Sequence, residues 1–239
     1  MIRRRYLVLG LAATLAVAAC SRADHQEGDL VSTSTSRTDF RAAVLDVRAD
    51  GCEPREILGT ASLIGSGHAL TAAHVVAGAQ RTTVIGSDGE RREAQVVLLD
   101  PDLDIAVLKT PEGIGEALDF YDGDIDAGTV GVVAFARLED GRVDVRTTDL
   151  EVLRHVDIAT TDIYLDRDVT RSGFEIAASI DPGDSGAVVV IGGGAAGVIW
   201  ARSTEREGRA WAVDIPDVVR DPVTRRALVV PVDTGVCAR

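Results

Sequence analysis

The feature that most constrains the fold is the pattern of apolar segments from Phe40 onward, which are short and end at turn residues. Examples are GTASLIGSG, EAQVVLLD, GTVGVVAFAR, DIYLDR and AVVVIGGG. Segments of about five to eight residues, rich in valine, isoleucine and threonine and separated by turn residues, are typical of an all-β sandwich or barrel. The sequence therefore predicts an all-β fold.

An acidic, glycine-rich stretch divides this β-rich region in two. It reads PEGIGEALDFYDGDIDAG over residues 111–128 and has the composition of a connecting segment. A chain of 239 residues is long for one ordinary domain but common for a sandwich or a pair of barrels. We expect two six-stranded antiparallel barrels, over about residues 40–115 and about 125–239. Short helices are expected to begin within Ala69–Val76 and, near the C-terminus, over Ile215–Arg220.

The N-terminus has the pattern of a secretory signal peptide. Three arginines at residues 3–5 precede an uncharged run over residues 6–19, which is too short for a membrane span and suits a signal peptide. The run ends in VAAC, which resembles a bacterial lipobox. That resemblance implies removal of residues 1–19, a lipid on Cys20 and an extracytoplasmic protein anchored to the bacterial membrane. The alternative is an ordinary signal peptide with a chance cysteine. Residues 20–39 are polar and predict a flexible tether.

The three cysteines support the same compartment. An odd number in an exported protein calls for an explanation. If Cys20 carries lipid, Cys52 and Cys237 remain as one pair near the two ends of the folded region. A disulfide between them would fit an oxidising compartment. The alternative is two unrelated thiols.

Charge and histidine spacing exclude several partners. The formal net charge is −13, and removal of the three leader arginines makes it −16. Nucleic-acid binding depends on basic patches, so nucleic acid is not an expected partner. The histidines His25, His68 and His155 stand without spaced partners. We therefore expect no metal and no cofactor.

Three short segments carry side chains suited to nucleophilic catalysis. His74 lies in LTAAHVV, Asp104 opens DIAVLK, and Ser185 lies in IDPGDSGAVVV. Taken alone, a serine in a glycine-rich bend can be a turn residue only, and Asp102 is an alternative carboxylate. The chain order His, Asp, Ser differs from that of α/β-hydrolases and of subtilisin-like enzymes. The order therefore disfavours a lipase or esterase of the α/β-hydrolase kind.

The segments TAAH, DIAVL and PGDSGA resemble the three signature blocks of the trypsin-like (chymotrypsin-fold) serine peptidases. The resemblance covers Val44 to Val219 and is strongest to bacterial branches, the HtrA-type and MarP-type protease domains. Similarity to the MarP type extends to DIYLDRDVTR and to the terminal cysteine pair. The chain has no I-V-G-G segment, whose freed amine would pair with Asp184. Activation by trypsin-like cleavage is therefore not expected.

The resemblance implies a role for each catalytic residue. A serine hydroxyl is a poor nucleophile at neutral pH and needs an adjacent base, for which imidazole is suited. His74 would take the Ser185 proton, and Asp104 would hold the ring in the correct tautomer. The backbone N–H groups of Gly183 and Ser185 would form the oxyanion hole.

Specificity residues follow from the same resemblance. Ser179, six residues before the nucleophile, would form the floor of the P1 pocket, and Trp200 and Ala201 would line the groove and pair with the peptide as an added strand. Val198 stands where glutamate-specific relatives carry a histidine. We therefore expect a protein or peptide substrate with a small or medium apolar P1 residue, and a monomeric enzyme. The competing hypothesis is a protease-shaped lipoprotein that acts as a binding or chaperone module without turnover.

Overall fold

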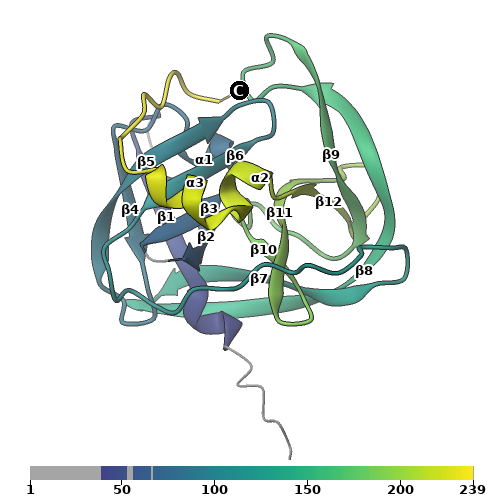
Figure 1. Ribbon diagram of the computed structural model, residues 1–239, viewed down its shortest axis with the longest axis horizontal. Helices are drawn as coiled ribbons and strands as arrows, with labels where there is room; N and C mark the ends of the chain where they lie inside the picture. Colours follow the sequence, from purple (N-terminus) through teal and green to yellow (C-terminus); the bar gives the residue numbers. More distant parts are fainter. Residues whose placement is uncertain (1–38, 53–55, 66, 239) are drawn as a thin grey trace, which may run out of the picture. The chain divides into compact units, whose positions relative to one another are not determined.

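The short apolar segments of the sequence form two closed antiparallel barrels of six strands each (Figure 1). The computed structural model describes residues 39–52, 56–65 and 67–238. The predicted all-β fold of two six-stranded barrels is confirmed. The predicted signal peptide and most of the predicted tether, with Cys20, lie outside the described residues.

The first barrel is preceded by a 3₁₀ helix, η1 (Phe40–Ala43), and closes in the order β1-β2-β3-β6-β5-β4. The helix α1 (Ala73–Val76) follows the third strand and carries His74. The strands are β1 (Val44–Asp50), β2 (Ile57–Gly65), β3 (His68–Thr71), β4 (Arg81–Ile85), β5 (Arg91–Asp100) and β6 (Ile105–Lys109).

The second barrel closes in the order β10-β11-β12-β9-β8-β7. Its strands are β7 (Val130–Glu139), β8 (Arg142–Thr161), β9 (Asp168–Ala177), β10 (Val188–Ile191), β11 (Gly194–Arg202) and β12 (Arg209–Asp214). The long β8–β9 hairpin extends along one side of the barrel (Figure 1).

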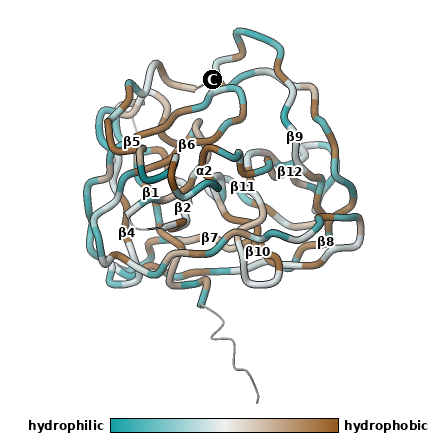
Figure 2. Tube along the Cα trace, in the orientation of Figure 1, coloured by the Kyte–Doolittle hydropathy of each residue, from teal (hydrophilic) through white to brown (hydrophobic). Residues whose placement is uncertain are grey.

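The interior of the barrels consists mostly of valine, leucine, isoleucine and alanine. Phe174 is the largest of the fully buried side chains. This composition follows from a sequence in which aromatic residues make up only 4% of the chain. Figure 2 shows hydrophobic residues along the strands and hydrophilic residues at many of the turns.

One predicted strand segment is a turn. DIYLDR was expected to be a strand, but residues 162–167 connect β8 to β9. The Asp162 carboxylate accepts hydrogen bonds from the backbone N–H groups of Tyr164 (3.1 Å) and Asp166 (3.0 Å). An aspartate that bonds its own downstream backbone favours a turn over a strand.

Backbone and side-chain hydrogen bonds join the two barrels. Thr60 on β2 donates its N–H to the Ser185 carbonyl oxygen at 2.9 Å. The Thr60 hydroxyl oxygen accepts from Ala136 N at 3.2 Å, and Asp46 accepts from Leu138 N at 3.0 Å. The first bond holds the segment around Ser185 against the first barrel, and the other two hold β7 against it.

The predicted helix over Ile215–Arg220 is confirmed by α2 (Asp217–Arg220), and a second helix, α3 (Pro222–Ala227), follows it. Residues 228–238, here called the C-terminal segment, then return to the first barrel. Val232 N donates to Val96 O at 2.9 Å. In the part of the chain that the structure describes, no helix has the length and apolar character needed to cross a bilayer.

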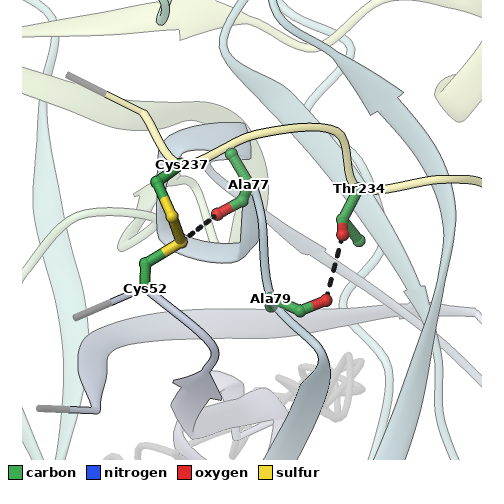
Figure 3. Close-up of a disulfide and its surroundings, with 5 residues drawn as sticks. All are labelled: Cys52, Ala77, Ala79, Thr234 and Cys237. Atoms are coloured by element: carbon green, nitrogen blue, oxygen red, sulfur yellow. Dashed lines mark hydrogen bonds between the residues drawn. A yellow bond between two sulfur atoms is a disulfide. The ribbon is translucent and has the colours of Figure 1, made fainter. Parts of the chain in front are cut away.

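A disulfide joins Cys52 to Cys237, across 185 residues of sequence (Figure 3). This confirms the predicted pair. The Cys52 sulfur lies 3.3 Å from the carbonyl oxygen of Ala77, the residue after α1, and Thr234 Oγ1 donates to Ala79 O at 3.0 Å (Figure 3). The disulfide therefore fastens the C-terminal segment beside the helix that carries His74.

Candidate active site

The helix α1 and the turn before β6 bring His74 and Asp104 into contact. Asp104 Oδ2 lies 2.7 Å from His74 Nδ1, and Asp104 Oδ1 accepts from His74 N at 2.9 Å. The Asp104 carbonyl oxygen also accepts from Ala73 N at 3.1 Å. One aspartate thus holds both the imidazole ring and the backbone of the helix that carries it.

Asp104, and not Asp102, lies against the imidazole. Asp104 is 2% exposed and has a φ of 59°, in the left-handed region that aspartate tolerates better than most side chains. Such a backbone conformation costs about 1–3 kcal/mol and occurs preferentially at functional sites. The Asp102 carboxylate instead pairs with Arg167 at 2.5 Å.

The surroundings of His74 raise its pKa above the ordinary value. Burial of the ring lowers the pKa, but the charge of Asp104 and the hydrogen bond to it raise the pKa by more. The positive charge of Arg171 opposes this rise. Because 27% of the His74 side chain remains exposed, the ring is accessible from the surface.

The raised pKa predicts the acid limb of the pH profile. A histidine that acts as a general base must be neutral to accept a proton, so a peptidase that uses His74 should lose kcat/KM as the pH drops through the raised pKa, with a midpoint above 6.5. Initial rates on a peptide substrate from about pH 5 to about pH 9 would measure this. The variant His155→Gln should leave the midpoint unchanged, because His155 binds Asp214 elsewhere. A midpoint below 6.5 would contradict the assignment.

Ser185 lies in a loop that packs against the residues just before α1. Besides the Ser185–Thr60 bond, Gly186 contacts Thr71 and Ala72: a Cβ on Gly186 would lie 2.3 Å from Thr71 Oγ1 and 3.0 Å from Ala72 N. Gly186 also has a φ of 81°. Only glycine permits this close approach. Residues 182–186, here called the serine loop, therefore contact Ala72, which lies two residues before His74 in the sequence.

The serine loop leaves two backbone donors free. Gly183 has a φ of 93°, and its N–H and that of Ser185 donate to no described residue. Their neighbours are engaged, since Asp184 N donates to Asp181 O (3.1 Å) and Gly186 N to Ile199 O (2.9 Å). A pair of free N–H groups beside a nucleophile is the arrangement that binds an oxyanion.

Arg137 on β7 supports this loop from behind, a contact that the sequence analysis missed. Its Nη1 donates to Gly183 O at 2.8 Å and its Nη2 to Pro182 O at 3.4 Å. The same guanidinium pairs with the buried carboxylate of Asp184. Burial raises the pKa of Asp184, and the positive charge of Arg137 opposes that rise. One feature of the sequence could have indicated this contact. The chain has no I-V-G-G segment whose freed amine would pair with Asp184, so the carboxylate needed another cationic partner.

We predict that Arg137→Met lowers kcat about 10²–10³-fold, the cost of losing an oxyanion-hole donor. Without the guanidinium, the Gly183 carbonyl and the Asp184 carboxylate lose the partner that fixes their direction. Steady-state kinetics on a peptide would show the loss in kcat more than in KM. Arg146→Met is the matched control, since Arg146 pairs with exposed Glu139 and Asp144. Wild-type kcat in folded Arg137→Met would contradict the role.

A cavity of about 280 Å³ lies beside His74 and includes two of the predicted substrate-binding residues. Trp200 and Ala201 on β11 line it, whereas Ser179 is exposed after β9 and is not among its lining residues. The role of Ser179 in the P1 pocket stays a prediction. The cavity is lined by His74, Asp104, Thr160, Thr161, Asp162, Ile163, Leu165, Arg171, Trp200 and Ala201.

Two further properties describe the resting site. Within the described residues, no hydrogen bond joins the His74 ring to the Ser185 hydroxyl. Such bonds are often long in a free enzyme and tighten when substrate binds. Among the same residues, no group of three or more histidine, cysteine, aspartate or glutamate side chains could hold a metal ion.

The fold and the site define a class: a two-barrel protein in which a histidine–aspartate pair on the first barrel lies near a serine loop on the second. Residues 59–196 match the trypsin-like peptidase domain family, and the chain belongs to this family. This confirms the membership that the three signature segments predicted.

Among curated proteins, the chain is similar to the serine protease Rv3671c of Mycobacterium tuberculosis, with 28% identity over 199 residues. The match covers 82% of this chain and 49% of the relative, so the chain spans about half the length of the curated relatives it matches. The crystal structure of the Rv3671c protease in its active form has a TM-score of 0.74 at 26% identity, covering 84% of this chain and 87% of that one. The HtrA-type protease AlgW, solved with a tripeptide, has a TM-score of 0.60 at 25% identity, with coverage of 78% and 62%.

Proposed function

We propose that the protein is a serine endopeptidase that hydrolyses peptide bonds through Ser185, His74 and Asp104. The observation that carries the proposal is the imidazole of His74, which Asp104 holds and which follows the residues Thr71 and Ala72 that Gly186 of the Ser185 loop packs against. The two free N–H groups of that loop add a site for negative charge. Membership in the trypsin-like peptidase family and similarity to a protein named a serine protease support the same activity.

In the proposed mechanism, Ser185 Oγ attacks the carbonyl carbon of the scissile peptide bond and its proton passes to His74 Nε2. The carbonyl oxygen becomes an oxyanion and accepts hydrogen bonds from Gly183 N and Ser185 N. The C–N bond then breaks as His74 gives its proton to the leaving amine, which leaves an acyl-enzyme. Water, deprotonated by His74, attacks the ester and releases the acid. Asp104 stabilises the imidazolium in both halves.

The proposed substrate is an unfolded or extended stretch of protein. A peptide strand beside β11 would meet Trp200 and Ala201, in the mode of an added β-strand. Ile163, Leu165 and Trp200 line the cavity beside His74. This lining suits apolar side chains of the substrate on the N-terminal side of the scissile bond. A small or medium apolar P1 residue is part of this proposal.

The proposal places the enzyme outside the cytoplasm, held to the membrane by lipid on Cys20. The VAAC sequence and the Cys52–Cys237 disulfide support this placement. We predict that the full chain, expressed in a bacterium, incorporates labelled palmitate and fractionates with membranes. Cys20→Ser should abolish the label and move the protein to the soluble fraction, whereas Cys52→Ser should leave the label in place. A labelled Cys20→Ser protein would contradict the anchor.

The function is tested by incubating the purified protein with a peptide library and with a reduced, unfolded protein. Cleavage at defined bonds, blocked by a fluorophosphonate, is expected. Sequencing of the new termini would give the P1 preference. Stable binding of the unfolded protein without cleavage, unchanged when Ser185 is replaced, would instead support a binding or chaperone module.

A further inference from the structure

The segment 162–171, DIYLDRDVTR, contacts the turn over residues 101–104, here called the Asp104 loop. Ile163 N donates to Pro101 O at 3.2 Å, and Arg167 pairs with Asp102 at 2.5 Å. At the end of the segment, Arg171 Nε donates to Asp102 O at 2.7 Å. Three contacts from the second barrel thus fix the residues immediately before Asp104.

Arg171 also forms part of the substrate groove. Its Nη2 donates to Thr161 O at 3.1 Å, and its guanidinium carbon lies 4.4 Å from the centre of the Trp200 ring. Thr161, Trp200 and Arg171 all line the cavity beside His74. The Arg171 side chain therefore contacts both Trp200 in the wall of the groove and Asp102 in the Asp104 loop.

The environment of Arg171 indicates that its charge is retained at a cost. Only 3% of the residue is exposed, and its described hydrogen bonds go to carbonyl oxygens rather than to a carboxylate. Burial of a cation is unfavourable unless nearby groups compensate. Burial lowers the pKa of Arg171, and the carboxylates of Asp104, Asp102, Asp162 and Asp100 oppose this.

We propose that Arg171 is a positioning residue that sets the Asp104 loop against the Trp200 wall, so that the His74–Asp104 pair keeps its orientation while a peptide occupies the groove. The inference rests on the proposed peptidase function. A guanidinium suits this role because its rigid, planar fork can donate in two directions while its face stacks on an indole. A lysine would supply the charge but neither the fork nor the stacked plane.

The charge of Arg171 also acts on the pKa of His74, and this effect can be measured separately from the positioning of the Asp104 loop. Asp104 raises the pKa of His74 and Arg171 lowers it. Asp162 also lines the cavity, but its carboxylate accepts hydrogen bonds from backbone N–H groups of its own turn and from Arg167. Removing the Arg171 charge should therefore raise the pKa of His74, and a lysine in its place should keep that pKa near the wild-type value.

The test compares Arg171→Met and Arg171→Lys by the rate of labelling with a fluorophosphonate and by NMR titration of the His74 ring. Both variants should label about 10–100-fold more slowly than wild type, because displaced catalytic groups cost about that much. Only Arg171→Met should shift the His74 titration to higher pH. Arg154→Met, which removes an exposed arginine on the same hairpin, should change neither.

Labelling of both folded variants at the wild-type rate would overturn the positioning role. If Arg171→Met does not fold, as judged by circular dichroism, the Lys variant decides: a wild-type rate overturns the role and a slow rate supports it. If wild type itself does not label, the peptidase proposal fails. The His74 titrations in wild type and variants then test the Arg171 contact alone, and an unshifted titration in folded Arg171→Met overturns it.

Discussion

Replacing Ser185 with alanine is expected to lower kcat about 10⁶-fold, the loss seen when a nucleophile that works as part of a triad is removed. The reason is that the variant lacks the hydroxyl that would form the acyl-enzyme, although the backbone N–H groups at positions 183 and 185 would still stabilise an oxyanion. A residual rate about 10³–10⁴-fold above that of water is therefore expected. Initial rates on one peptide, at several enzyme concentrations, would measure it.

His74→Ala should cost a similar factor, and the double variant should lose little more, because the two groups act as a unit. The control is Ser203→Ala, in the loop after β11, whose hydroxyl bonds the N–H groups of Glu205 and Arg206. It should keep wild-type kinetics. Retention of more than about one per cent of activity in Ser185→Ala would contradict the assignment, since a triad serine is worth far more.

Asp104→Asn is expected to lower kcat about 10⁴-fold with a smaller change in KM. The amide preserves the shape of the side chain but favours the wrong imidazole tautomer and does not stabilise the imidazolium. It also removes the charge that raises the pKa of His74. The acid limb of any remaining activity should therefore move to lower pH. A profile of kcat against pH for wild type and variant measures both effects.

Asp102→Asn is the matched control, two positions away in the same loop. Asp102 pairs with Arg167 and uses its carbonyl, not its carboxylate, to bind Arg171. An exposed or half-exposed ion pair is worth about 1 kcal/mol or less. The loss should therefore stay below about tenfold. A larger loss in Asp102→Asn than in Asp104→Asn would mean that the wrong carboxylate has been assigned.

The strands could be predicted because their signal is local. A segment such as AVVVIGGG contains both the apolar run that is buried as β10 and the turn that ends it. The helix near His74 was harder to delimit. A short helix was expected to begin within Ala69–Val76, and α1 does begin there, at Ala73. The pattern did not show where in this range it begins, because Ala69 and Leu70 pair with β2 and β6 as part of β3. Their pairing between two neighbouring strands makes these residues part of a strand, and the spacing of apolar residues along the chain does not reveal that pairing.

The candidate site divides in the same way. His74, Asp104 and Ser185 are each embedded in a short segment with recognisable neighbours. Arg137 lies in no such segment, and Arg171 ends the DIYLDRDVTR segment without a local indication of its role. The partners of these two arginines lie 47 and 69 residues away in the sequence. Their roles depend on which strand faces which loop once both barrels have closed. Tertiary contacts of this kind are set by topology rather than by the residues on either side.

Mass spectrometry of the protein after reaction with a fluorophosphonate tests most directly whether His74 and Asp104 make one hydroxyl nucleophilic. At a pH above the acid limb of the wild-type profile, where the imidazole is neutral, one adduct per chain is expected, located on the peptide that contains Ser185. Denaturation before reaction should abolish the adduct. A folded protein that stays unmodified, or carries the adduct on another residue, would contradict the account.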